Sequence, residues 1–205
     1  MTQRRGVVHG RLQRQPGLNG FSINSFRSVL ARHGLTIGLL LLLAVGLFLI
    51  LESSGEEPGF LRPMAVLADG LQVARHLLLI LIGLIGFALL YWRWRRMVVS
   101  GRVLAWMGYL GLISFAEELV FRFIAPQLLE TALGWTWAVM VSNLVFAGLH
   151  YFTLRWQWVN CIAVFLGGLG LSRLFEVSDD FALIVLVHWF FTFLNTPLPP
   201  LARKP

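Results

Sequence analysis

Six long apolar runs follow one another along the chain, and each predicts a helix that crosses a bilayer, which takes about 20 residues. The first run is the most apolar, because it has no polar residue after Gly38, whereas the third, fourth and sixth contain Glu, Asn and His. The pattern therefore predicts an all-α fold, a polytopic transmembrane helical bundle with an apolar anchor and polar inner helices. The predicted helices span Leu35–Leu51, Val73–Trp92, Val103–Ile124, Leu133–Phe152, Trp158–Phe175 and Phe181–Leu194.

Composition agrees with a chain dissolved in lipid. Of its 205 residues, 57% are hydrophobic and only 13% are charged, whereas about a quarter of the residues in a typical soluble domain are charged. We expect one transmembrane helical domain over residues 35–195, between a basic cytoplasmic arm (1–34) and a short proline-rich cytoplasmic tail (196–205). The basic arm and first run also suggest a signal peptide, but the run is longer than a typical signal core and no small-x-small cleavage site follows it.

Basic and acidic residues outside the apolar runs are separated between alternate loops. Arginines fill the N-terminal arm and the loop after the second run, and the alternate loops hold most of the acidic residues. By the positive-inside rule, both termini are expected in the cytoplasm. The net charge of +7 thus marks topology and attracts anionic lipids, so we expect the lipid bilayer and not nucleic acid as a partner. All the basic residues except Lys204 are arginine, which points to a GC-rich bacterial genome and an inner-membrane location.

The third run contains three ionisable residues, Glu117, Glu118 and Arg122. Each costs roughly 2.5–3.5 kcal/mol at the centre of a membrane helix, so they need partners or a function. Residues four apart share a helix face, so Glu118 and Arg122 are predicted to pair. Glu117 points about 100° away and is left to act as a base.

Two other runs carry polar stripes. A single histidine in an apolar helix is more often a packed, hydrogen-bonded residue than a catalyst. Here two histidines and a double-Glu motif occur on three helices of one small bundle, which indicates a shared functional site. The fourth run has Asn143, Phe146 and His150 on one face, and the sixth has His188, Thr192 and Asn195.

The two histidines are predicted to lie at different depths in the membrane, which makes a shared site difficult to form. In straight helices, His188 lies roughly 10 Å and His150 roughly 25 Å from the outer ends of their helices. We therefore expect Pro126 to bend or shorten the exit of the third span, and the fourth span to begin nearer Val139, after an outer interfacial stretch around Trp135 and Trp137.

The motifs resemble those of the CAAX protease and bacteriocin-processing family (CPBP, or Abi) of glutamic-type intramembrane proteases. The E-E-x-x-x-R motif matches at Glu117, Glu118 and Arg122, and the F-x-x-x-H motif matches at Phe146 and His150. The third motif, H-x-x-x-N/D, is half met, because Thr192 stands where the family has Asn or Asp and Asn195 lies one turn farther on. The resemblance covers the last four predicted helices, with a core at about residues 103–195.

The resemblance implies catalytic roles for three residues. Glu117, helped by His150, would deprotonate a water that attacks the scissile carbonyl, and His188 would donate to the oxyanion with Thr192 or Asn195 assisting. Glu118 and Arg122 would support the site, and Asn143 would orient His150. The implied substrate is a membrane-embedded peptide or protein tail, such as a sorting tail or peptide precursor, and no cofactor is expected. The bacterial origin disfavours prenylated tails.

Two alternatives stay open. In a metalloprotease, Glu117, His150 and His188 would bind Zn²⁺ and leave a fourth position for water, although the chain has no H-E-x-x-H motif and no evident supporting carboxylate. A non-catalytic membrane protein for bacteriocin immunity, partner binding or ion or solute transport would use the same polar stripes for binding. A transporter would be expected to carry inverted repeats, which the sequence does not show.

Overall fold

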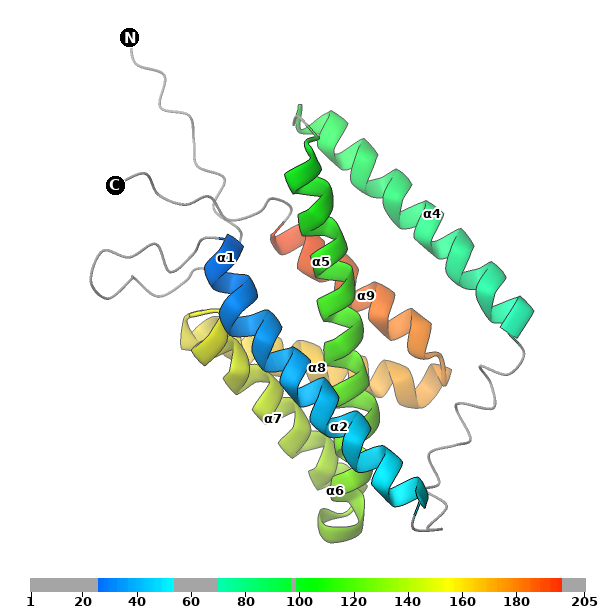
Figure 1. Cartoon of the computed structure of the whole chain (residues 1–205), viewed down its shortest axis with the longest axis vertical. Coiled ribbons are helices and arrows are strands. Elements are labelled where there is room, and N and C mark those ends of the chain that lie inside the picture. Colours follow the sequence, from blue (N-terminus) through cyan, green and yellow to red (C-terminus); the bar gives the residue numbers. More distant parts are fainter. Residues whose placement is uncertain (1–25, 54–69, 97–98, 197–205) are drawn as a thin grey trace.

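The computed structural model describes residues 26–53, 70–96 and 99–196, and this part of the chain is helical without any strand (Figure 1). The predicted all-α membrane helical bundle is thereby confirmed. Most of the basic arm, the loop between the first two predicted helices and most of the tail lie outside the described residues.

Each apolar run corresponds to a helix, and the helices of the second, fourth, fifth and sixth runs end within a few residues of the predicted positions. Polar and glycine residues set these ends. Gly134, with φ of 74°, separates the third and fourth runs, and the carboxylate of Asp180 caps the last helix by accepting from the Leu183 amide at 2.9 Å. The helices are α2 (Leu35–Ser53), α4 (Gly70–Trp94), α5 (Gly101–Glu118), α7 (Trp135–Thr153), α8 (Trp158–Ser178) and α9 (Phe181–Asn195).

The first helix begins earlier than the sequence predicts. A short helix α1 (Phe26–Val29) and a π-helical turn η2 (Leu30–Gly34) precede α2 without a break. Val29 and His33 are buried, at 1% and 3% exposure, so this segment belongs to the packed bundle. The apolar pattern did not predict this segment, because its arginines and histidine interrupt the apolar run. In the structure, packing against the bundle buries the residues on its inner face.

The third run continues well beyond Ile124. A π-helical turn η3 (Leu119–Ile124) joins α5 to α6 (Ala125–Leu133), and Pro126 sits in the first turn of α6, where its missing N–H is tolerated. Pro126 therefore does not end the helix. The helix α7 begins at Trp135, directly after Gly134, so the stretch around Trp135 and Trp137 is helical.

Three of the described helical segments are long and apolar enough to cross a membrane: Leu30–Leu47, Gly101–Leu133 and Trp158–Ser178. Leu81–Trp94 in α4 and Phe181–Asn195 are shorter apolar helices. α7 has the length for a span, but Asn143 and His150 lower its mean hydropathy. In α7, the polar residues expected to form the site are thus the ones that lower its hydropathy as a candidate membrane span.

α5 occupies the centre of the bundle, with α2 crossing on one side and α9 on the other (Figure 1). α7 packs along both α8 and α6. α4 stands at the edge and contacts α9, where Trp92 meets Phe193 with ring centroids 5.8 Å apart. Two apolar clusters, one around Trp106 and Trp189 and one around Phe121 and Phe146, enclose the polar residues of α5.

Candidate active site

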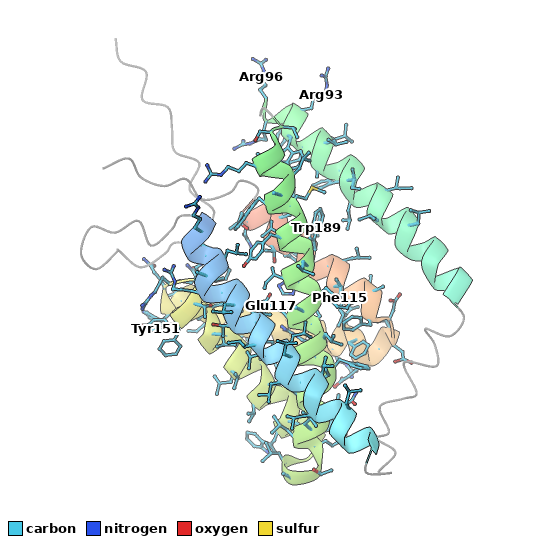
Figure 2. The ribbon with its side chains drawn as sticks, in the orientation of Figure 1. Arg93, Arg96, Phe115, Glu117, Tyr151 and Trp189 are labelled. Carbon is cyan, nitrogen blue, oxygen red and sulfur yellow. The ribbon has the colours of Figure 1, made fainter. Side chains whose placement is uncertain are left out.

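The two glutamates of α5 are buried in the interior of the bundle. Glu117 is 2% exposed and Glu118 is fully buried, and Figure 2 shows Glu117 within the bundle, where α2 crosses α5. Two buried carboxylates this close must each be compensated by cations or hydrogen-bond donors.

Glu118 has the stronger set of partners. Its Oε1 lies 3.3 Å from Nη1 of Arg122, the pair that the i, i+4 spacing predicts. The same oxygen lies 2.6 Å from Nδ1 of His188. Arg122 is buried as well, and its guanidinium lies 3.9 Å from the centre of the Phe146 ring, a cation–π contact. Glu118 and Arg122 therefore form a buried structural pair that also holds one face of His188.

Glu117 faces three histidines. The distances from its carboxylate to their Nε2 atoms are 2.9 Å for His33, 3.5 Å for His188 and 4.0 Å for His150. The different depths of His150 and His188 in their helices were expected to keep the two side chains apart. In the structure both lie near Glu117, one from α7 and the other from α9. The His33 contact is at ion-pair distance, and Oε1 of Glu117 has no further hydrogen-bond partner among the described residues.

Each histidine is held through its other ring nitrogen. Nδ1 of His150 lies 2.8 Å from the carbonyl oxygen of Phe146, so Nδ1 donates and Nε2 points toward Glu117. Nδ1 of His188 contacts Glu118, and Nδ1 of His33 lies 2.8 Å from Oγ1 of Thr153. The fold thereby fixes the orientation of all three rings.

His33 is the site residue that sequence reasoning missed, because it was placed in the basic arm. Val29, His33 and Ile37 follow one another at intervals of four and are all buried. This i, i+4, i+8 stripe is the signal that could have revealed an inward-facing helix before Leu35.

Asn143 does not orient His150, contrary to the expectation. Its Nδ2 donates to the Val139 carbonyl at 2.9 Å and lies 3.0 Å from Oγ of Ser172, so it links α7 to α8. The two residues share a face, but seven residues of helix separate them by about 10 Å along the axis. The carbonyl of Phe146 takes the role that was expected of Asn143.

Thr192 and Asn195 line the same cavity as Glu117 and His188. Among the described residues, the ion pairs and hydrogen bonds at the two glutamates come from Arg122 and the three histidines, and not from Thr192 or Asn195. The two candidates for the third motif thus lie beside the site and do not contact its carboxylates.

A cavity of about 410 Å³ opens beside Glu117. Most of its wall is apolar, and its polar lining includes Glu117, the three histidines, Arg122, Asn160, Thr192, Asn195 and Thr196. Gly168 of α8 is required in this wall, because a Cβ there would collide with Oδ1 of Asn143 and would lie 2.7 Å from Nη2 of Arg122. The apolar wall includes Trp106, Leu110, Ile113, Val164, Leu171 and Phe191.

The geometry for a shared metal is weaker than the residue types suggest. Glu118 does support His188 as a carboxylate behind a metal ligand would. However, the histidines approach two different oxygens of Glu117, and no group of three or more His, Cys, Asp or Glu side chains in the described segments is arranged to hold an ion. This arrangement of Glu117, His150 and His188 therefore adds no support for the Zn²⁺ alternative, which stays a prediction.

The fold and site together define a membrane-embedded helical protein with a buried carboxylate and histidines at a cavity. Residues 99–194 match the family model described as type II CAAX prenyl endopeptidase Rce1-like. The chain thus carries a domain of the CAAX protease family, and the resemblance found in the three motifs is confirmed. At the level of this family, the match supports an intramembrane endopeptidase. Comparisons with curated proteins and with solved structures gave no match.

Proposed function

We propose that the protein cleaves a membrane-associated peptide or protein tail with a water activated by Glu117. The observation that carries this proposal is the state of Glu117. It is a buried carboxylate whose Oε1 has no hydrogen-bond partner among the described residues beyond the His33 contact, and it lines a cavity beside three imidazole rings. A carboxylate in this position can accept a proton from a water in the cavity.

The reaction follows from the positions of these groups. Glu117 takes one proton from the water as its oxygen bonds to the scissile carbonyl carbon, and the carbonyl oxygen becomes an oxyanion. When the carbon–nitrogen bond breaks, Glu117 returns the proton to the leaving amine nitrogen. His150 assists by accepting a hydrogen bond from the same water at Nε2, which lies 4.0 Å from the Glu117 carboxylate and is free to accept because Nδ1 carries the ring proton donated to Phe146. Water and one peptide bond are consumed, and one acid and one amine form.

His188 is the candidate donor to the oxyanion. Glu118 accepts from Nδ1 and stabilises a protonated ring, which then presents an N–H at Nε2 toward the reacting atoms. Thr192, one turn farther along α9, offers a hydroxyl on the same cavity wall. We assign the second oxyanion contact to Thr192, with Asn195 as the alternative.

The apolar wall of the cavity supports a hydrophobic segment as substrate, such as a sorting tail or a peptide precursor held in the bilayer. The charge pattern supports a bacterial inner-membrane protein with both termini in the cytoplasm and with anionic lipid, not nucleic acid, around its basic loops. We propose that no metal or other cofactor takes part.

The test compares membranes from cells that express the wild type, Glu117→Gln and Glu130→Gln at equal levels. Glu130 is an exposed glutamate of α6 and serves as the matched control. Mass spectrometry searches for a peptide terminus present with the wild type and Glu130→Gln and absent with Glu117→Gln. Such a terminus supports proteolysis and identifies the substrate. If no terminus depends on Glu117 while the variant keeps a partner or an immunity phenotype, the protease proposal is wrong and a binding role replaces it.

A further inference from the structure

The histidine with the shortest contact to Glu117 comes from outside the family segment. His33 lies in η2 and is 3% exposed, whereas the family match begins at residue 99. Its Nε2 lies 2.9 Å from Oε1 of Glu117, closer than either motif histidine. The segment that carries His33 is therefore part of the site and not only a membrane anchor.

Hydrogen-bond donors and acceptors define the state of this ring. Thr153 donates its hydroxyl proton to the Leu149 carbonyl at 2.6 Å, so its Oγ1 accepts from Nδ1 of His33 at 2.8 Å. Nδ1 of His33 therefore carries a proton. The 2.9 Å contact with Glu117 requires another proton between the two atoms, because a bare imidazole nitrogen and a carboxylate oxygen repel each other.

The charges of the cluster favour a protonated imidazole beside Glu117. Glu117, Glu118 and Arg122 sum to one negative charge if all the histidines are neutral, and an uncompensated charge in the interior is costly. The hydrogen bonds at Nδ1 of His150 and Nδ1 of His188 need only one proton on each ring. The contact between His33 and Glu117 is the shortest carboxylate–imidazole contact at Glu117, so an additional proton on this ring lies where it offsets the charge of that carboxylate.

A second contact seats the same turn on α7. Nε of Arg32 donates to the carbonyl oxygen of Thr153 at 3.1 Å, so adjacent residues of η2 bind the carbonyl and the hydroxyl of one threonine. Besides Glu117, the titratable side chains near His33 include His150, whose ring centroid lies 5.5 Å away, and Arg155 acts electrostatically on the adjacent Arg32. These two contacts with Thr153 thus fix the position of the π-helical turn on α7 and hold His33 beside Glu117.

We propose that His33 is the positioning residue of Glu117, a protonated imidazole that holds the carboxylate ionised and aimed at the cavity. The role of His33 in catalysis rests on the proposed function, whereas the pairing of His33 with Glu117 does not. His33 keeps both ring protons throughout the reaction, and the proton that moves between water and amine travels on Glu117. Removing His33 therefore lowers the turnover number and leaves substrate binding unchanged.

The activity test uses the full-length chain in proteoliposomes, with the membrane peptide identified by its Glu117-dependent terminus as substrate. His33→Asn keeps an amide near the position of Nδ1 and loses the reach to Glu117, whereas His33→Gln places an amide nitrogen near the position of Nε2. We expect His33→Asn to lower kcat roughly 100-fold at constant KM and His33→Gln to recover it to within about tenfold of the wild type. Arg27→Gln, at an exposed position of the preceding helix α1, is the matched control and should stay within about twofold.

A double-mutant cycle tests the pair without relying on proteolysis. Tm is measured in detergent for His33→Asn, Glu117→Gln and the double variant, with Arg27→Gln and Glu117→Gln as the control cycle. We expect the two Tm shifts to be non-additive for His33 and additive for Arg27. Additive shifts for His33, or a His33→Asn enzyme with wild-type kcat, would overturn the inference. If no Glu117-dependent cleavage exists, the proposed function is wrong, and the cycle alone then decides whether His33 holds Glu117.

Discussion

The carboxylate of Glu118 and the imidazole of His188 meet at 2.6 Å, through Oε1 and Nδ1. This contact turns the ring so that Nε2, the nitrogen toward Glu117, is the one available to a reacting group. Adjacent glutamates of one helix therefore have different surroundings. Glu118 is bound by Arg122 and His188 as part of the framework, and Glu117 is presented to the cavity.

Replacing Glu118 should destabilise the fold more than it alters the shape of the site. Glu118→Gln leaves the guanidinium of Arg122 buried without a counter-charge, and breaking a buried pair costs about 3–5 kcal/mol. We expect a large fall in Tm, measured by thermal unfolding in detergent. The double variant Glu118→Gln with Arg122→Met should be less destabilised than Glu118→Gln alone, because it removes the orphaned charge. An equal or larger loss in the double variant would show that Arg122 contributes mainly through its contact with Phe146.

Gly168 should not tolerate a side chain. A methyl group there would collide with Asn143 and crowd Arg122, and such overpacking costs about 1–3 kcal/mol. Gly167→Ala is the matched control, because a Cβ at the neighbouring position meets no atom within 4 Å. We expect Gly168→Ala to lower Tm and Gly167→Ala to leave it unchanged or raise it, since alanine favours helix. Equal Tm values for the two variants would mean that Asn143 and Arg122 move aside freely.

Narrowing the cavity should impair cleavage without unfolding the protein. Ala163 of α8 lines the cavity and is exposed, so Ala163→Trp adds bulk without cutting into a packed core. Ile162 is adjacent, 48% exposed and outside the cavity lining, which makes Ile162→Trp the control. We expect Ala163→Trp to raise KM for the peptide substrate about tenfold or more while Tm stays constant. If both tryptophans act alike, the substrate reaches Glu117 by another path.

Thr192 should act on turnover if it donates to the oxyanion. Thr192→Val keeps the shape and removes the hydroxyl, so we expect kcat to fall roughly 100-fold with little change in KM. Thr192→Asn, which restores the residue type of the family motif, should retain activity. The corresponding change at Asn195, Asn195→Leu, is expected to cost less than about tenfold in kcat. The opposite ranking of Thr192→Val and Asn195→Leu would assign the oxyanion contact to Asn195.

Local spacing predicted much of the site. The pairing of Glu118 with Arg122 follows from helix periodicity alone, and the shared face of Phe146 and His150 follows in the same way. The role given to Asn143 failed, because a shared face does not bring two side chains together when two turns of helix separate them. Such a side chain can form hydrogen bonds with a nearby backbone carbonyl or with a neighbouring helix, and the periodicity of the sequence does not show which partner it takes.

The sequence by itself determined the all-α membrane bundle, the approximate helix ends and the residues of the family motifs. These features depend on apolar run length and on contacts within about one helical turn, both of which are encoded locally. Only the tertiary structure decided that η2 continues the first helix inward, that α7 and α9 bring His150 and His188 to one carboxylate, and that His33 joins them. These relations depend on how helices distant in sequence cross and tilt, which is set by packing across the whole bundle.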